Sequence, residues 1–92
     1  MPKYYPYKIA DHFLYFTAQC IVEAMHVHAS DSRLTESSSA KFFVRADGSS
    51  VLRRRGDLTD RQVSLIRKFI QANYLDMYRT WKDFGGEDFY RR

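Results

Sequence analysis

The sequence holds a single cysteine, Cys20, among its 92 residues. One cysteine excludes an intramolecular disulfide and a zinc site built from several cysteines, and it fits a reducing compartment. Long apolar runs are also lacking, since none approaches the roughly 18 residues of a membrane-spanning helix. The N-terminus shows neither the basic nor the apolar region of a signal peptide. We therefore expect a cytoplasmic protein without a membrane partner.

Motifs of high specificity for catalysis or metal binding are missing as well. No His-Glu-x-x-His segment or paired-cysteine motif occurs. The residues present are 45% apolar and 16% aromatic, a composition that excludes disorder caused by low hydrophobicity. The length predicts one domain, with a core over about residues 7–84 and a polar tail over 85–92. A domain of this size offers at most a shallow cleft, or one shared with a partner.

The charge balance is moderately basic. Fifteen Lys and Arg against eleven Asp and Glu give a net charge of +4, which favours polyanionic partners. Arg53, Arg54 and Arg55 form the basic run of the chain, and with Arg45 they make a candidate surface for nucleic-acid phosphates. The alternative interpretation is an edge strand that its charges protect against aggregation.

Strand patterns dominate the first part of the chain. Aromatic and β-branched residues over 13–17, alternation over 25–29 and the segments 40–46 and 50–54 predict strands. Asp47-Gly48 predicts the turn that joins the last two as a hairpin. Residues 4–9 are at most an edge strand, because Pro6 cannot donate a ladder hydrogen bond. We expect an α+β fold, with a mainly antiparallel sheet of four to five strands packed against a C-terminal helical segment.

The helical segment begins at a well-marked N-terminus. Thr59 as N-cap and Gln62 three residues later form a capping box, and Asp60 suits the helix dipole. Apolar residues then recur at helical spacing from Val63 to Trp81, as in a helix packed on a sheet. Asn73 interrupts this segment and competes for backbone hydrogen bonds, so a break there is favoured over one long bent helix.

Several of these pieces together resemble a family of small bacterial proteins, the domain-of-unknown-function family numbered 4160. The matching residues are Phe13 to Phe16, His26-Val27-His28, Ala40-Lys41-Phe42, and Ile66, Ile70, Asn73, Leu75 and Trp81. The resemblance covers about residues 7–84, although Met25 stands where that family usually has proline. It implies a component of a two-gene cassette of the toxin–antitoxin kind, a small, conditionally toxic or nucleic-acid-facing protein with a cognate protein partner. As the nucleic acid we expect RNA rather than DNA.

The two histidines are the candidate reaction centre. Alternation in a strand places His26 and His28 on one face, about 7 Å apart. Two imidazoles can act as general acid and base in RNA cleavage, and Lys41 can stabilise the developing phosphorane charge without a metal or other cofactor. Glu23 belongs to the same candidate constellation.

Other roles for these histidines stay open. They can be structural, which would make the domain a non-enzymatic protein-interaction module, or they can bind a metal with Glu23, Asp31 or His12 as third ligand. Cys20 lies beside Ile21 and Val22 and is expected to be a small buried hydrophobic residue. Of these readings, the sequence favours nucleic-acid-directed activity without a bound metal.

Overall fold

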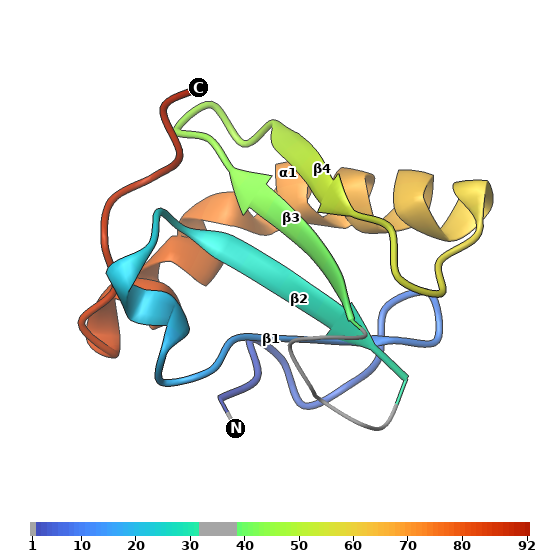
Figure 1. Cartoon of the computed structure of the whole chain (residues 1–92), viewed down its shortest axis with the longest axis horizontal. Helices are drawn as coiled ribbons and strands as arrows, with labels where there is room; N and C mark the ends of the chain where they lie inside the picture. The colour runs from blue at the N-terminus through green and yellow to red at the C-terminus, as the bar shows by residue number, and fades with distance from the viewer. Residues whose placement is uncertain (1, 32–38) are drawn as a thin grey trace.

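The computed structural model describes residues 2–31 and 39–92. Four antiparallel strands form one sheet in the order β1-β2-β3-β4, as Figure 1 shows. The strands are β1 (Phe13–Tyr15), β2 (His26–Ser30), β3 (Ala40–Val44) and β4 (Ser50–Arg54), and a short 3-10 helix η1 (Cys20–Val22) lies between the first two. The helix α1 (Asp60–Asp83) follows the sheet. The predicted α+β class is confirmed.

The start of α1 is confirmed and the break at Asn73 is wrong. The Thr59 side chain accepts a hydrogen bond from the Gln62 amide while the Gln62 side chain accepts one from Thr59, which completes the capping box. The helix continues unbroken past Asn73. The Asn73 amide donates to the Phe69 carbonyl at 2.9 Å, one turn earlier, so its hydrogen bonding is satisfied inside the helix.

The apolar core lies between α1 and one face of the sheet (Figure 1). Val63, Ile66, Ile70, Met77 and Trp81 on the helix are buried, as the helical spacing predicts. They share the core with alternate residues of the strands, which include Leu14, Val27, Ala29, Phe42 and Val44. Burying one such side chain completely is worth about 1.5 to 3 kcal/mol. Among the described residues, no helix is long and apolar enough to cross a membrane.

The β3–β4 hairpin is fixed against the side of α1. Gly48 has φ +87°, a left-handed conformation that favours glycine, and a Cβ there would lie 2.5 Å from Gln71 Nε2. The Gln71 amide donates to the Asp47 carbonyl at 2.9 Å. The Ser49 hydroxyl and amide both donate to the Asp47 carboxylate and lower its pKa. β4 is an edge strand of the sheet, and these contacts hold its hairpin beside the first half of the helix.

The C-terminal tail folds back onto the sheet. The Met25 amide donates to the Asp88 carbonyl, and the Tyr90 amide donates to the Val44 carbonyl at 2.8 Å. The tail ends beside the β3–β4 hairpin (Figure 1). The opening segment 3–9, in contrast, forms isolated bridges at its two ends, Lys3 with Tyr15 and Ile9 with His12, and the Tyr4 amide donates to the Leu14 carbonyl at 2.9 Å.

Candidate functional site

The period of two along β2 places His26 and His28 on one face, as predicted. Val27 and Ala29 alternate with them and belong to the apolar core. The two imidazoles are nevertheless covered, with exposed fractions of 0% for His26 and 2% for His28. Their ring centroids lie 5.0 Å apart in an edge-to-face arrangement. The pair is therefore an interior feature of the molecule.

Cys20 joins the two histidines. Its sulfur lies 3.2 Å from His28 Nε2, and it is itself only 2% exposed. Ligand atoms of Cys20, His26 and His28 all lie within 4.8 Å of one another. We call these three residues the His–Cys cluster. Its two imidazole nitrogens and one thiol sulfur are a donor set that suits a transition metal.

The turn between β1 and β2 brings Cys20 to this position. The Cys20 amide donates to the Thr17 carbonyl at 3.0 Å, which closes the turn that leads into η1. The Thr17 amide lies 3.2 Å and its hydroxyl 3.1 Å from the Cys20 sulfur. The sequence did not predict the contact with the histidines, because the apolar neighbours of Cys20 indicated only a small buried hydrophobic residue. The available signal was its position in the connection between two strands that pair with each other.

The three residues that the sequence offered as third metal ligand lie elsewhere. The Glu23 carboxylate pairs with Lys41 Nζ at 2.9 Å. The Nδ1 atom of His12 contacts the Ala10 carbonyl at 2.7 Å, and Asp31 is exposed just after β2. Among the described residues, Cys20 is the side chain with a ligand atom close to those of both histidines.

Lys41, the third residue of the predicted reaction centre, is the cross-strand neighbour of His28. Its ammonium group contacts the Glu23 carboxylate and lies 5.0 Å from the centroid of the Phe43 ring. His28 Nδ1 lies 3.1 Å from the Ser39 hydroxyl, so both of its ring nitrogens contact side chains of the protein itself. The structure brings the three predicted residues together, with both ring nitrogens of His28 and the ammonium group of Lys41 engaged in internal contacts.

Aromatic rings continue from the His–Cys cluster across the sheet. Tyr15 on β1 lies 5.5 Å from His28 between ring centroids, and Phe43 on β3 lies 5.7 Å from His26. Tyr90 in the tail stacks on Phe43 at 4.3 Å. Trp81, near the end of α1, meets the His26 ring at 5.4 Å. These contacts hold the His26 ring within an aromatic surrounding.

The predicted basic residues are divided between the two ends of β4. Arg53, Arg54 and Arg55 are exposed at its C-terminal end, where Lys41, Arg53 and Arg54 line a pocket of about 420 Å³. The Arg55 guanidinium forms an exposed ion pair with Asp60 at 2.7 Å. Arg45 lies beyond the other end, where its side chain donates to the Ser49 hydroxyl and to the Arg92 carbonyl. Arg45 is therefore separated from the other three by the length of the strand.

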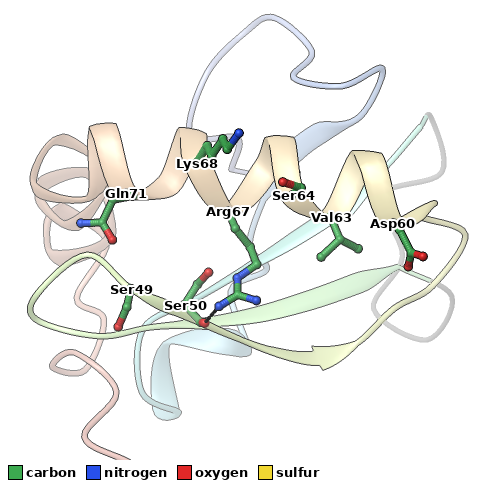
Figure 2. Close-up of a pocket in the computed structure, with 8 residues that line it drawn as sticks. All are labelled: Ser49, Ser50, Asp60, Val63, Ser64, Arg67, Lys68 and Gln71. Atoms are coloured by element: carbon green, nitrogen blue, oxygen red, sulfur yellow. Dashed lines mark hydrogen bonds between the residues drawn. The ribbon is translucent and has the colours of Figure 1, made fainter.

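A groove of about 400 Å³ runs between α1 and β4, and we call it the β4–α1 groove. Figure 2 shows Arg67 reaching from the helix to the strand, where it donates to the Ser50 carbonyl at 3.0 Å, whereas Lys68 points away from the strand. Ser50 is 3% exposed, and its hydroxyl has no hydrogen-bond partner in the part of the chain that the structure describes. The other lining residues are Ser49, Asp60, Val63, Ser64 and Gln71.

Sequence reasoning did not predict the β4–α1 groove. The helix residues that line it follow one another at intervals of three or four, from Asp60 through Ser64 and Arg67 to Gln71, which is the spacing of one polar stripe. That stripe was the available signal. Its pairing with β4 depends on how the helix packs against the sheet.

Comparisons with known proteins identify a family without an assigned activity. The model of the family described as Domain of unknown function (DUF4160) matches residues 12–82. That range contains the His–Cys cluster, β4 and most of α1. No curated protein and no solved structure matches the chain.

Proposed function

We propose that this chain, which belongs to the DUF4160 family, is a nucleic-acid-binding protein of the toxin–antitoxin type that binds RNA in preference to DNA. The observation that carries the proposal is the arrangement of basic side chains along β4. Arginines lie at the C-terminal end of this edge strand, and the β4–α1 groove with Arg67 runs along its side. The net charge of +4 gives the domain a general attraction to polyanions.

The β4–α1 groove supplies groups that suit a phosphate. The planar guanidinium of Arg67 can donate two parallel hydrogen bonds to phosphate oxygens. The Ser50 hydroxyl adds a buried donor beside it, and a buried donor without a partner costs about 1 to 3 kcal/mol, which a phosphate oxygen would offset. Arg53 and Arg54 on the same strand, together with Lys41 on β3, offer further positive charge around the second pocket. A nucleic-acid backbone that follows β4 would contact both the groove and this pocket.

The preference for RNA rests on the neutral polar groups of the groove. The Ser64 hydroxyl and the Gln71 amide line it beside Arg67. Such groups both donate and accept hydrogen bonds, as the ribose 2′-hydroxyl does, and this hydroxyl distinguishes RNA from DNA. We therefore expect tighter binding of single-stranded RNA than of DNA with the same base sequence.

The proposed activity is binding, and cleavage by His26, His28 and Lys41 stays a prediction. A general acid or base needs a ring nitrogen within hydrogen-bond reach of the substrate. The imidazoles are 0% and 2% exposed, and His28 contacts Cys20 and Ser39 through its two nitrogens. Expressing the wild type and the His26→Ala, His28→Ala variant, followed by electrophoresis of total RNA, tests cleavage. RNA fragmentation by the wild type alone, with both proteins folded, would establish it.

Fluorescence anisotropy with labelled 20-nucleotide RNA and DNA, over a series of salt concentrations, tests the proposed binding. The key variant is Arg53→Ala, Arg67→Ala. Loss of two phosphate contacts should weaken RNA binding and reduce the slope of log K against log salt by about 1.4 for a single strand.

The matched control is Arg79→Ala, Arg91→Ala, which removes the same charge from two exposed arginines outside β4 and the groove. The control should bind RNA as the wild type does. Equal weakening of RNA binding by both pairs of substitutions would show that only the net charge matters, and it would contradict a site at β4. Absence of RNA binding by the wild type at low salt would contradict the proposed function itself.

A second candidate function rests on the open edge of the sheet. β4 is a terminal strand, so an extended segment of a cognate protein can add to it by main-chain hydrogen bonds. Such a complex should persist at salt concentrations that dissociate RNA. Co-expression with the product of the adjacent reading frame tests it. Capture of that product in high salt, together with relief of growth arrest, would support this candidate.

A further inference from the structure

We propose that the His–Cys cluster is a binding site for one transition-metal ion of the zinc class. Cys20, His26 and His28 come from two elements, η1 and β2, and their ligand atoms already lie within 4.8 Å of one another. Two imidazole nitrogens and one thiolate sulfur are ligands that Zn²⁺ prefers. The three side chains are at most 2% exposed, which gives the site the dry surrounding of a protein metal centre.

The contact of His26 with the backbone prepares its ring for metal binding. His26 Nδ1 lies 2.9 Å from the Ala24 carbonyl. A carbonyl only accepts, so Nδ1 carries the hydrogen and Nε2 of the neutral ring carries the lone pair. Metal-binding histidines commonly hold their second nitrogen in this way, by donating to a carbonyl or carboxylate.

Side chains of the protein also orient His28 and Cys20. The Ser39 hydroxyl lies 3.1 Å from His28 Nδ1, which leaves Nε2 directed at the Cys20 sulfur, 3.2 Å away. The Thr17 amide donates to that sulfur at 3.2 Å, which fixes the position of the Cys20 side chain. With Zn–S of about 2.3 Å and Zn–N of about 2.0 Å, tetrahedral ligands lie about 3.5 Å apart. Small movements of the side chains therefore complete the site.

Three protein ligands leave one position of a tetrahedral metal for water or an outside ligand. A metal here would tie the connection between β1 and β2 to the face of the sheet. Because the metal would bind the folded chain in preference to the unfolded chain, it should raise the free energy of unfolding. Lys41, the cross-strand neighbour of His28, also borders the pocket proposed to attract RNA. The metal site rests on Cys20, His26 and His28, which take no part in the proposed RNA binding, so either proposal can fail without the other.

Titration of the untagged protein with Co²⁺ tests the proposal directly. A thiolate–cobalt bond produces charge-transfer absorption in the near ultraviolet, and tetrahedral Co²⁺ has intense visible bands. We expect both to saturate at one Co²⁺ per chain and to disappear when Zn²⁺ displaces it. Because the cluster is buried, the metal is added to the native protein and also during refolding. Absence of the charge-transfer band in both preparations of the wild type would overturn the proposal.

Variants assign the ligands. Cys20→Ser should abolish the charge-transfer band, and His26→Gln should weaken binding, whereas a simple Cys20–His28 pair would be indifferent to His26. Ser39→Ala should lower affinity about 10- to 100-fold, the usual effect of losing a group that orients a metal-binding histidine. The matched control is His12→Gln, another buried histidine whose Nδ1 contacts the carbonyl two residues earlier. Equal loss in this control would contradict the site.

Thermal unfolding of the wild type keeps the test independent of whether variants fold. Zn²⁺ at about a hundredfold excess over Kd should raise Tm on the order of 10 °C for a domain of this size. Mg²⁺, which prefers oxygen ligands, should leave Tm unchanged and is the control ion. An unchanged Tm in saturating Zn²⁺ would overturn the proposal.

Discussion

The two faces of β2 are equally buried and chemically different. Val27 and Ala29 face the apolar core with α1, whereas His26 and His28 face Cys20 and the aromatic rings of Tyr15 and Phe43. Apolar groups gain from burial without any directional contact, but a buried imidazole costs free energy unless its nitrogens find partners. Apolar burial alone therefore accounts for the side chains of β2 that face α1. The buried histidines of the His–Cys cluster need specific contacts as well. The proposed metal site lies on the histidine face of β2, where Cys20 and Trp81, both members of the apolar core, border the pair.

Substitutions of two neighbouring phenylalanines on β3 should differ most in their effect on stability. Phe42 is fully buried in the core, whereas Phe43 is partly buried on the other face and stacks on Tyr90. Phe42→Ala should reduce the free energy of unfolding by about 3 to 5 kcal/mol, because it leaves a cavity. Phe43→Ala should cost about 1 to 2 kcal/mol, mainly its stacking and partial burial. Urea unfolding measures both, and equal losses would contradict the difference between the faces.

A substitution within the His–Cys cluster should have an intermediate effect. His28→Leu keeps the bulk but removes a hydrogen-bond partner from Cys20 and from Ser39. We expect the free energy of unfolding to fall by about 1 to 3 kcal/mol, measured by urea unfolding with a chelator present so that metal plays no part. Val27→Leu, on the core face of the same strand, is the control for altered packing. A stabilised His28→Leu protein would show that the cluster contributes no specific contacts.

The smallest expected effect concerns the C-terminal tail, in which Tyr90 stacks on Phe43 beside the His–Cys cluster. Hydrogen bonds from the Phe89 amide, the Tyr78 hydroxyl and the Arg91 guanidinium lower the pKa of Asp88 from 3.8 to about 2. The stabilisation that these bonds provide is present above pH 3.8 and is lost as the pH falls through about 2.

Amide exchange at Tyr90, whose amide bonds Val44, should therefore accelerate between pH 4 and pH 2 beyond the intrinsic pH effect. Asp88→Asn cannot titrate and should remove this additional change. Persistence of the same additional change in Asp88→Asn would assign it to another group.

The elements with local signals were predictable from the sequence. The capping box of Thr59 and Gln62 acts within one turn of helix, and Asp47-Gly48 sets the hairpin within a few residues, so both are confirmed. The break at Asn73 failed because the prediction weighed the intrinsic preference of asparagine. In the folded chain its side chain bonds the Phe69 carbonyl, and neighbouring turns pack on the sheet.

The candidate sites were predictable only in part, because they depend on contacts between distant segments. Alternation placed His26 and His28 on one face, but their burial and their contact with Cys20 follow from the turn after β1. Arg53 to Arg55 were recognised as a run, whereas Arg67 gained its place beside Ser50 only through the packing of α1 on the sheet edge. Sequence spacing gives no information on such a juxtaposition.

In the proposed complex, RNA lies along β4 and the adjoining half of α1. Amide chemical shifts of the ¹⁵N-labelled protein, followed during titration with a single-stranded RNA, test this location directly. We expect the largest changes over residues 49–55 and 60–71, with a reduced response in Arg53→Ala, Arg67→Ala. Changes centred on residues 20–30 or on the tail, or an unchanged spectrum at low salt, would contradict it.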